Sequence, residues 1–172
     1  MAITYEPIAT NTLSSAAASV TFSSISGSYT DLVLVVNGSI DSTQTPSLAI
    51  RLNGDTGNSY SSTIMEGNGT SALSQRYSGN KTLMQFNYYT AFYSTNIANA
   101  ILHIQNYSNT TTYKTVLCRF NITGGNAPGT AASVGLYRGN TSAITSISIS
   151  PDFGAINFAS GSAFTLYGIK SA

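Results

Sequence analysis

The chain has 172 residues, the usual length of a single globular domain. Lys and Arg number seven and Asp and Glu six, which gives a net charge of +1 and only 8% charged residues, whereas Ser, Thr and Asn together supply 63 residues. So few basic residues argue against a nucleic-acid binder, and the lack of a basic amphipathic helix argues against a membrane-surface protein. We therefore expect neither nucleic acid nor membrane among its partners.

Apolar and polar residues alternate along most of the chain, which is the pattern of half-buried β-strands. In chain order, the expected strands are 17–23, 32–36, 48–52, 59–65, 82–93, 98–106, 113–121, 132–138, 145–150 and 163–169. The segment 32–36 (LVLVV) is apolar at every position, which predicts a central strand or one that lies under an interface. No segment repeats apolar residues with a helical period, so we expect very little helix.

Turn-forming residues separate these strands. Residues 53–58 (NGDTGN) and 124–129 (GGNAPG) have the composition of loops, and residues 108–111 are expected to join strands 98–106 and 113–121 as a hairpin. Ten short strands at this spacing predict an all-β protein with a jelly-roll-like, antiparallel β-sandwich fold. We expect one domain over residues 1–172, with residues 1–12 as a candidate extended N-terminal arm.

Asp55-Thr56-Gly57 matches the tripeptide that carries the catalytic carboxylate of aspartic proteases. That chemistry needs two carboxylates that share a proton, so a single copy would require a symmetric dimer. A cation loop built on Asn53, Asp55 and Asn58 is a further alternative, but residue 64 is Ile where a calcium loop of the EF-hand type has Glu. The favoured interpretation of Asp55 is a turn residue, and no metal is expected.

A nucleophilic site would need a Cys–His pair, for which the chain offers only Cys118 and His103. Cys118 lies in an alternating apolar run, which is typical of a buried, inert thiol. The six carboxylates are widely spaced, so a glycosidase pair has no support from the sequence. We therefore predict no catalytic residue, no cofactor and no enzymatic activity.

An aromatic cluster in residues 86–93 is the strongest candidate for contacts with other molecules. Exposed rings can stack on sugars, while the alternative is that some of them fill the core and the others pack against a neighbouring subunit. The candidate interface or ligand-contact residues are Tyr88, Tyr89, Phe92 and Tyr93.

Six segments in order resemble a family of small all-β proteins encoded by tailed bacteriophages, many of them aquatic. They are residues 3–10 (ITYEPIAT), 19–25 (SVTFSSI), 28–32 (SYTDL), 51–60 (RLNGDTGNSY), 106–111 (NYSNTT) and 160–170 (SGSAFTLYGIK). The family is regarded as virion structural proteins and brings no catalytic residues. The resemblance therefore implies a virion protein that is assembled in the host cytoplasm.

Within a virion, the expected role is a capsid-surface decoration (cement) protein that stabilises the shell and contacts other virion proteins such as the major capsid protein. The alternative is a tail-fibre or receptor-binding module that recognises host surface glycans, and an enzyme acting on polysaccharide is a third hypothesis. Most expected strands, such as 32–36 and 145–150, lack the Lys or Pro that blunts an exposed sheet edge. We therefore expect a homo-oligomer, and the resemblance suggests a trimer.

Overall fold

The computed structural model of the chain describes residues 4–88, 90–124, 128–152 and 154–170. Over these residues it contains strands and no helix. The strands are β1 (Tyr5–Thr12), β2 (Val20–Phe22), β3 (Asp31–Gly38), β4 (Leu48–Leu52), β5 (Tyr60–Gly67), β6 (Ala72–Lys81), β7 (Met84–Gln85), β8 (Ala98–Ile104), β9 (Lys114–Ile122), β10 (Gly129–Tyr137), β11 (Ile147–Pro151) and β12 (Ala163–Ile169).

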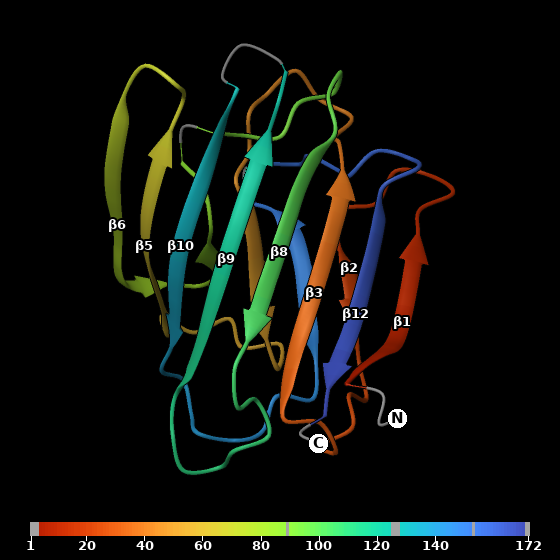
Figure 1. The fold of residues 1–172 in the computed structure, drawn as a ribbon, viewed down its shortest axis with the longest axis vertical. Coiled ribbons are helices and arrows are strands. Elements are labelled where there is room, and N and C mark those ends of the chain that lie inside the picture. Colours follow the sequence, from red (N-terminus) through yellow and green to blue (C-terminus); the bar gives the residue numbers. More distant parts are fainter. Residues whose placement is uncertain (1–3, 89, 125–127, 153, 171–172) are drawn as a thin grey trace.

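The strands form two sheets that pack face to face. The larger sheet has eight strands in the order β1-β12-β3-β8-β9-β10-β5-β6, and the smaller has four in the order β2-β11-β4-β7. In Figure 1 the smaller sheet lies behind the larger one. The chain changes sheet repeatedly, for example from β3 to β4 and back to β5, and neighbouring strands are antiparallel. The predicted all-β, jelly-roll-like antiparallel sandwich is confirmed.

The core lies between the two sheets and is filled by the inward members of the alternating patterns. Its centre is a chain of aromatic rings from both halves of the sequence. Phe158 lies 4.9 Å from Phe164 and 5.8 Å from Phe92, and Phe92 lies 5.3 Å from Phe120, all in edge-to-face arrangements. Such pairs add to the free energy of burial, so these rings hold the two layers in register.

Nine expected strands are present, and 48–52 and 163–169 have the predicted bounds. The prediction of one strand over residues 82–93 is wrong for most of that length, because within it only β7 pairs with a neighbouring strand. Asn87 explains this: its side-chain oxygen accepts the backbone N–H of Leu48 at 2.7 Å and its amide donates to the carbonyl of Thr90. The chain therefore turns away from the sheet after Gln85. Strand β6 was not predicted, because its residues are mainly polar on both faces and do not alternate with apolar ones.

The segments 32–36 and 145–150, which carry neither Lys nor Pro, are not at the edges of their sheets, because β3 lies between β12 and β8, and β11 lies between β2 and β4. The central position of β3 agrees with its apolar sequence. The edges of the large sheet are β1 and β6. β1 carries Pro7 and a register shift between Pro7 and Ala9, and β6 carries Arg76 and Lys81. These are the features that natural proteins use to blunt edges.

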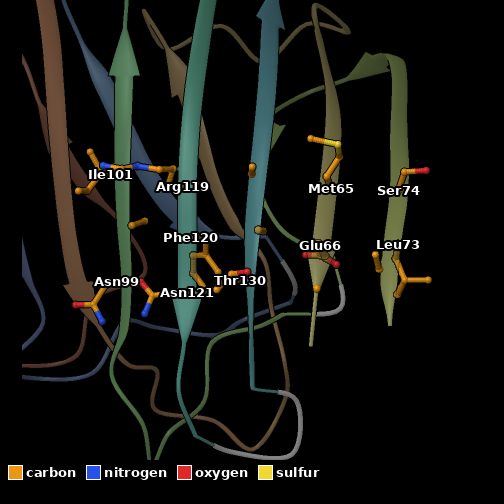
Figure 2. A pocket seen from close by; sticks show the side chains of 15 residues that line it. Met65, Glu66, Leu73, Ser74, Asn99, Ile101, Arg119, Phe120, Asn121 and Thr130 are labelled. Atoms are coloured by element: carbon orange, nitrogen blue, oxygen red, sulfur yellow. The ribbon is translucent and has the colours of Figure 1, made fainter. Parts of the chain in front are cut away.

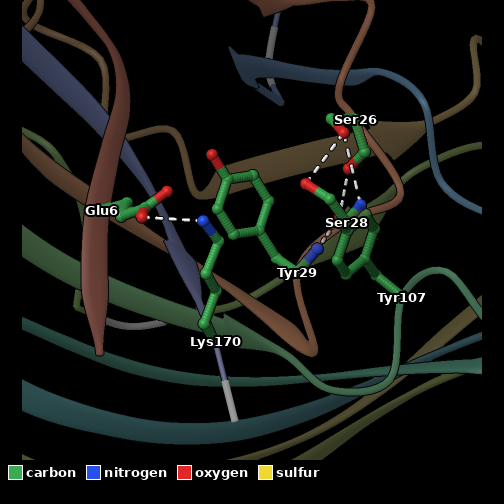
Figure 3. A network of polar contacts seen from close by, with 6 residues as sticks. All are labelled: Glu6, Ser26, Ser28, Tyr29, Tyr107 and Lys170. Atoms are coloured by element: carbon green, nitrogen blue, oxygen red, sulfur yellow. Dashed lines mark hydrogen bonds and ion pairs between the residues drawn. The ribbon is translucent and has the colours of Figure 1, made fainter. Parts of the chain in front are cut away.

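Residues 5–12, expected as an extended arm, form the edge strand β1, which pairs with β12. A polar network holds the first part of this strand (Figure 3). Lys170 donates to Glu6 at 2.8 Å and lies 5.5 Å from the centre of the Tyr29 ring. This hydrogen bond lowers the pKa of Glu6. Next to it, the Tyr29 N–H donates to the hydroxyl of Tyr107 at 3.3 Å, so β1 is tied to the loops at this end of the sandwich.

Candidate functional site

The outward side of the eight-stranded sheet, which we call the outer face, carries a group of exposed apolar side chains on neighbouring strands, with Arg119 among them. Met65, Ile101, Leu117 and Val134 are 63%, 39%, 41% and 47% exposed. They come from β5, β8, β9 and β10, which are neighbours in the sheet, and Leu117 lies directly opposite Val134. We call these four residues the apolar patch. A contiguous apolar patch, unlike scattered exposed residues, is typical of an interaction surface.

The outward side of the smaller sheet is different. Thr21 on β2 donates a hydrogen bond to the hydroxyl of Ser148 on β11 at 3.1 Å, and Ser148 lies opposite Arg51 on β4. Around Thr21, Ser148 and Arg51 this side therefore presents hydroxyls and a guanidinium, which are suited to contact with water. The two sides of the sandwich thus differ in chemistry, and the apolar patch is confined to one of them.

Two open hollows extend over the outer face. The larger, of about 920 Å³, reaches from β8 to β6, and the smaller, of about 480 Å³, lies over β8, β9 and β10. Met65, Ile101, Arg119 and Ala132 line both. Figure 2 shows Ile101 and Arg119 at the same level on β8 and β9, with Met65 across the hollow on β5.

A row of uncharged polar side chains borders the apolar patch. Asn37, Asn99, Asn121 and Thr130 lie opposite one another on four consecutive strands, β3, β8, β9 and β10. Figure 2 shows Asn99 and Asn121 side by side, below Arg119. Within the described ranges, the side chains of these four residues and of Arg119 make no hydrogen bond or ion pair with the rest of the chain. They are therefore available to a ligand or a partner.

His103 also lies on the outer face, where its Nε2 is 3.0 Å from Oδ2 of Asp31. The other carboxylate oxygen of Asp31 accepts the backbone N–H of Asn106 at 2.7 Å, which fixes the orientation of the carboxylate. Sequence reasoning missed this pair because it depends on β3 lying beside β8, residues separated by 72 positions in the chain. Of the two, His103 lines the smaller hollow, together with Tyr5.

The structure rules out a Cys118–His103 site. In the β8–β9 ladder, His103 lies opposite Leu117, and Cys118 lies opposite Leu102, so the sulfur and the imidazole are on opposite faces of the sheet. Cys118 is 3% exposed, and burial raises the pKa of its thiol from 9.0 to about 12. The predicted buried, inert thiol is confirmed.

The four aromatic residues proposed as contacts occupy different environments. Tyr88 is 41% exposed and its ring packs edge-on against Tyr77 at 5.9 Å. Phe92 is fully buried in the aromatic core, so its ring has no surface for a ligand. Tyr93 is half-buried against the core, and Tyr89 lies outside the described residues. Tyr88 is therefore the member of this group with the most exposed ring among those the structure describes.

Asp55 is a turn residue, as predicted. Its Oδ1 accepts the N–H of Gly57 at 2.6 Å, and this bond lowers the pKa of the carboxyl. The oxygen of Asn53, which the cation alternative required, accepts the N–H groups of Thr145 and Ser146 at 2.8 and 3.2 Å. The oxygens of this loop thus hold backbone donors.

In the described part of the chain, no three His, Cys, Asp or Glu side chains come together in a way that could hold a metal ion. Over the same residues there is also no helix of the length and apolarity that a membrane span requires.

The apolar patch has a signal in the sequence that alternation alone does not reveal. Ile64-Met65, Ile101-Leu102 and Val116-Leu117 each place two apolar residues side by side within a strand. Adjacent strand residues point to opposite faces, so one member of each pair must face outward. Several such pairs on strands that become neighbours predict an apolar outer face, but the strand order is needed to show that they meet.

The chain matches no protein-family model and no curated protein. Two solved structures are similar to it in part. One is the alginate lyase Aly36B, at 10% identity and a TM-score of 0.38 over 95% of this chain and 80% of that chain. The other is the marine PL-14 alginate lyase from Aplysia kurodai, at 12% identity and a TM-score of 0.37 over 86% of this chain and 72% of that one. A likeness of this size does not bear on function.

Proposed function

We propose that this chain is a bacteriophage virion structural protein, a capsid-surface decoration protein that stabilises the shell by docking through its outer face. The observation that carries the proposal is the apolar patch of Met65, Ile101, Leu117 and Val134 on one side of the sandwich. A cement protein needs a broad apolar surface toward the shell and a polar surface toward water. The sandwich has one side of each kind, and the resemblance of its segments to phage virion proteins points in the same direction.

The mechanism is the burial of apolar surface between neighbours. Full burial of an aliphatic side chain is worth about 1.5–3 kcal/mol, so covering four half-exposed side chains contributes about 4 kcal/mol per copy. A partner that binds only the assembled shell stabilises that shell by mass action. Few charges take part, so the association should depend weakly on salt. Under this proposal the partners are the major capsid protein and further copies of this chain, arranged as a trimer.

A binding experiment with matched variants tests the proposal. Shells from particles that lack the gene are mixed with purified protein, sedimented, and assayed for bound protein and for the temperature at which they rupture. Leu117→Asp places a charge in the apolar patch and should abolish binding, whereas Thr21→Asp places the same charge on the outward side of the smaller sheet and should bind normally. Equal binding by the two variants would contradict docking through the outer face.

A second candidate function, a module that binds host surface glycans, is favoured by the polar row. The amides of Asn99 and Asn121 and the hydroxyl of Thr130 lie in line beside Arg119 and have no partner in the described ranges. Such groups can bind the hydroxyls of a sugar chain. Retention of the purified protein on host-surface polysaccharide, with loss of retention in Asn121→Ala but not in Leu117→Asp, would favour this function over the first.

We propose further that the chain has no enzymatic activity. His103 and Asp31 form the arrangement on the outer face that most resembles an acid–base pair, so an activity would be expected to depend on His103. The enzyme that the sequence left as a third hypothesis acts on polysaccharide, so acidic polysaccharides such as alginate are the substrates to test. Incubation with alginate should produce no shortened chains. Cleavage that disappears in His103→Gln would overturn this part of the proposal.

A further inference from the structure

Two guanidinium groups lie on the outer face. Arg119 on β9 is exposed and lies opposite Ile101 of the apolar patch. Figure 2 shows its side chain extended toward Ile101. Arg76 on the edge strand β6 is also exposed, and it lies opposite Thr63, an outward residue of β5. Thr63 in turn lies opposite Val134, so Arg76 shares a cross-strand row with the apolar patch.

These two arginines are the cations that the chain leaves free. Within the described ranges, Arg76 and Arg119 make no hydrogen bond or ion pair with the rest of the protein. The chain has seven Lys and Arg residues, and the other five each have a partner inside the chain: Arg51, Lys81, Lys114, Arg138 and Lys170. Both free charges are therefore on the face that carries the apolar patch.

The carboxylates of the chain do not neutralise these charges. Each of the six already accepts a hydrogen bond within the described chain: Glu6, Asp31, Asp41, Asp55, Glu66 and Asp152. Asp31 is the one that lies on the outer face, where it is held by His103 and by the backbone N–H of Asn106. A second copy docked through the same face would place positive charge against positive charge, which is unfavourable. The occupant of this face is therefore a different, anionic partner.

Covering the apolar patch would also remove water from Arg119, because Arg119 lies among the patch residues. A buried charge without a partner is strongly unfavourable. A guanidinium that meets a carboxylate, by contrast, can form two parallel N–H···O bonds with it. An occupant that covers the apolar patch therefore has to bring an acceptor to Arg119, and a carboxylate fits best.

The positions of the two arginines set the spacing of the acceptors. Arg119 is level with Ser74 of β6 across three strand spacings, and Arg76 lies two residues further along β6. Strand spacings of about 4.8 Å and a rise of about 3.4 Å per residue place the two Cα atoms about 16 Å apart. Met65 and Val134 lie on the two strands between them. Residues four apart in an extended chain span about 13 Å, a difference that two long arginine side chains can cover.

We propose that the outer face binds an acidic, extended segment of a shell subunit. Two carboxylates four residues apart pair with Arg119 and Arg76, and an apolar residue midway between them packs on Met65 and Val134. In an extended chain these three residues point to the same side. A nucleic acid or an acidic polysaccharide would bring charge with little apolar surface, so the combination of two cations and an apolar patch favours a protein segment. This proposal names the partner of the docking face and in that respect rests on the proposed function.

A peptide titration followed by amide NMR tests the binding chemistry without a shell. The probe is a soluble peptide with the central sequence Glu-Thr-Val-Thr-Glu, and the control peptide has Gln in place of both Glu residues. The Glu peptide should shift the signals of residues 65, 76, 117–119 and 134 saturably and bind about fivefold more tightly than the Gln peptide. Arg119→Leu and Arg76→Leu should each reduce that preference to about twofold, since one of two ion pairs is lost.

Arg51→Leu is the matched control, because it makes the same change on the outward side of the smaller sheet and should leave the preference unchanged. Equal affinity for the two peptides, or no saturable binding of the Glu peptide, would overturn the inference. Tighter binding of an oligogalacturonate than of the Glu peptide would also overturn it and would assign the two arginines to an acidic polysaccharide.

Sedimentation with shells separates this inference from the proposed function. Arg119→Leu enlarges the apolar surface and removes the charge, so it should weaken shell binding at least about fivefold if a carboxylate meets Arg119. If the contact were purely apolar, the same change would leave binding unchanged or strengthen it. Normal binding by Leu117→Asp would contradict docking through the outer face. Loss of binding in Leu117→Asp with undiminished binding in Arg119→Leu would leave docking in place and overturn this inference alone.

Discussion

Replacing Cys118 with Ala should reverse the order of stability between the variant and the natural chain as the pH rises. Cys118 lies in the core and its thiol pKa is raised by burial from 9.0 to about 12. In the unfolded chain the thiol ionises near its ordinary value, while in the folded chain it stays protonated. The unfolded state therefore binds fewer protons between these two pH values, and the natural chain loses stability over that window.

The magnitudes follow from the structure. Deleting the sulfur at neutral pH should cost about 1–2 kcal/mol, the effect of removing a small buried apolar group. Each pH unit above the pKa of the unfolded thiol costs the natural chain about 1.4 kcal/mol, or about 2.7 kcal/mol from pH 9 to pH 11. The Ala variant has no thiol and does not suffer this loss. The two free energies of unfolding should therefore cross near about pH 10.

Urea unfolding followed by circular dichroism at pH 8 and pH 11 measures both free energies. The tyrosines ionise in both proteins, so the difference between the two isolates Cys118. If Cys118 were an activated thiolate, its pKa in the folded chain would lie below 9. The free energy of unfolding lost on its removal would then grow as the pH rises to about 9 and stay constant above that pH. If the cost of removing Cys118 does not fall between pH 8 and pH 11, the assignment of Cys118 as a buried, inert thiol is refuted.

Three further predictions concern the turn, the core and the assembly. Asp55→Asn should change the free energy of unfolding by less than about 1 kcal/mol at pH 7 and leave shell binding intact, because Asn keeps the oxygen that accepts the Gly57 N–H; a loss of function with unchanged folding would revive a chemical role for Asp55. Phe158→Ala should lower the free energy of unfolding in urea by about 3–5 kcal/mol, since the ring is fully buried between two others. Replacing the exposed Tyr113 with Ala should change that free energy by less than about 0.5 kcal/mol, and similar effects of the two changes would contradict the described core. In sedimentation at micromolar concentration the protein should run as a trimer that about 1 M salt does not dissociate, because there are few charges to screen; a monomer would count against the assembly.

The alternation of apolar and polar residues was sufficient to predict the strands whose two faces differ in polarity. Residues 48–52 and 163–169 alternate clearly, and the structure places strands there with the same bounds. The edge strand β6 could not be predicted, because its residues are mainly polar on both faces and so apolar and polar residues do not alternate along it. The prediction of a strand over 82–93 was wrong because the aromatic residues there are buried by a turn around Asn87 rather than by strand pairing. These failures arise where side-chain hydrogen bonds or position in the sheet override the local pattern.

The candidate site was less accessible to sequence reasoning, because it is created by the order of the strands. Alternation in β9 places Leu117 on the outward face, but its neighbours Ile101 and Val134 are supplied by β8 and β10. By contrast, the inert state of Cys118 and the turn at Asp55 were predictable, since both depend on adjacent residues.

An electron-microscopy reconstruction of the virion whose genome encodes this chain would show whether the protein decorates the shell. We expect density for the sandwich at regular positions on the outside of the shell, with the outer face of the eight-stranded sheet buried against its neighbours. It also predicts that Thr21 and Ser148, on the outward side of the smaller sheet, face the solvent. Absence of the protein from the particle, or a copy on the shell whose apolar patch faces water, would contradict the account.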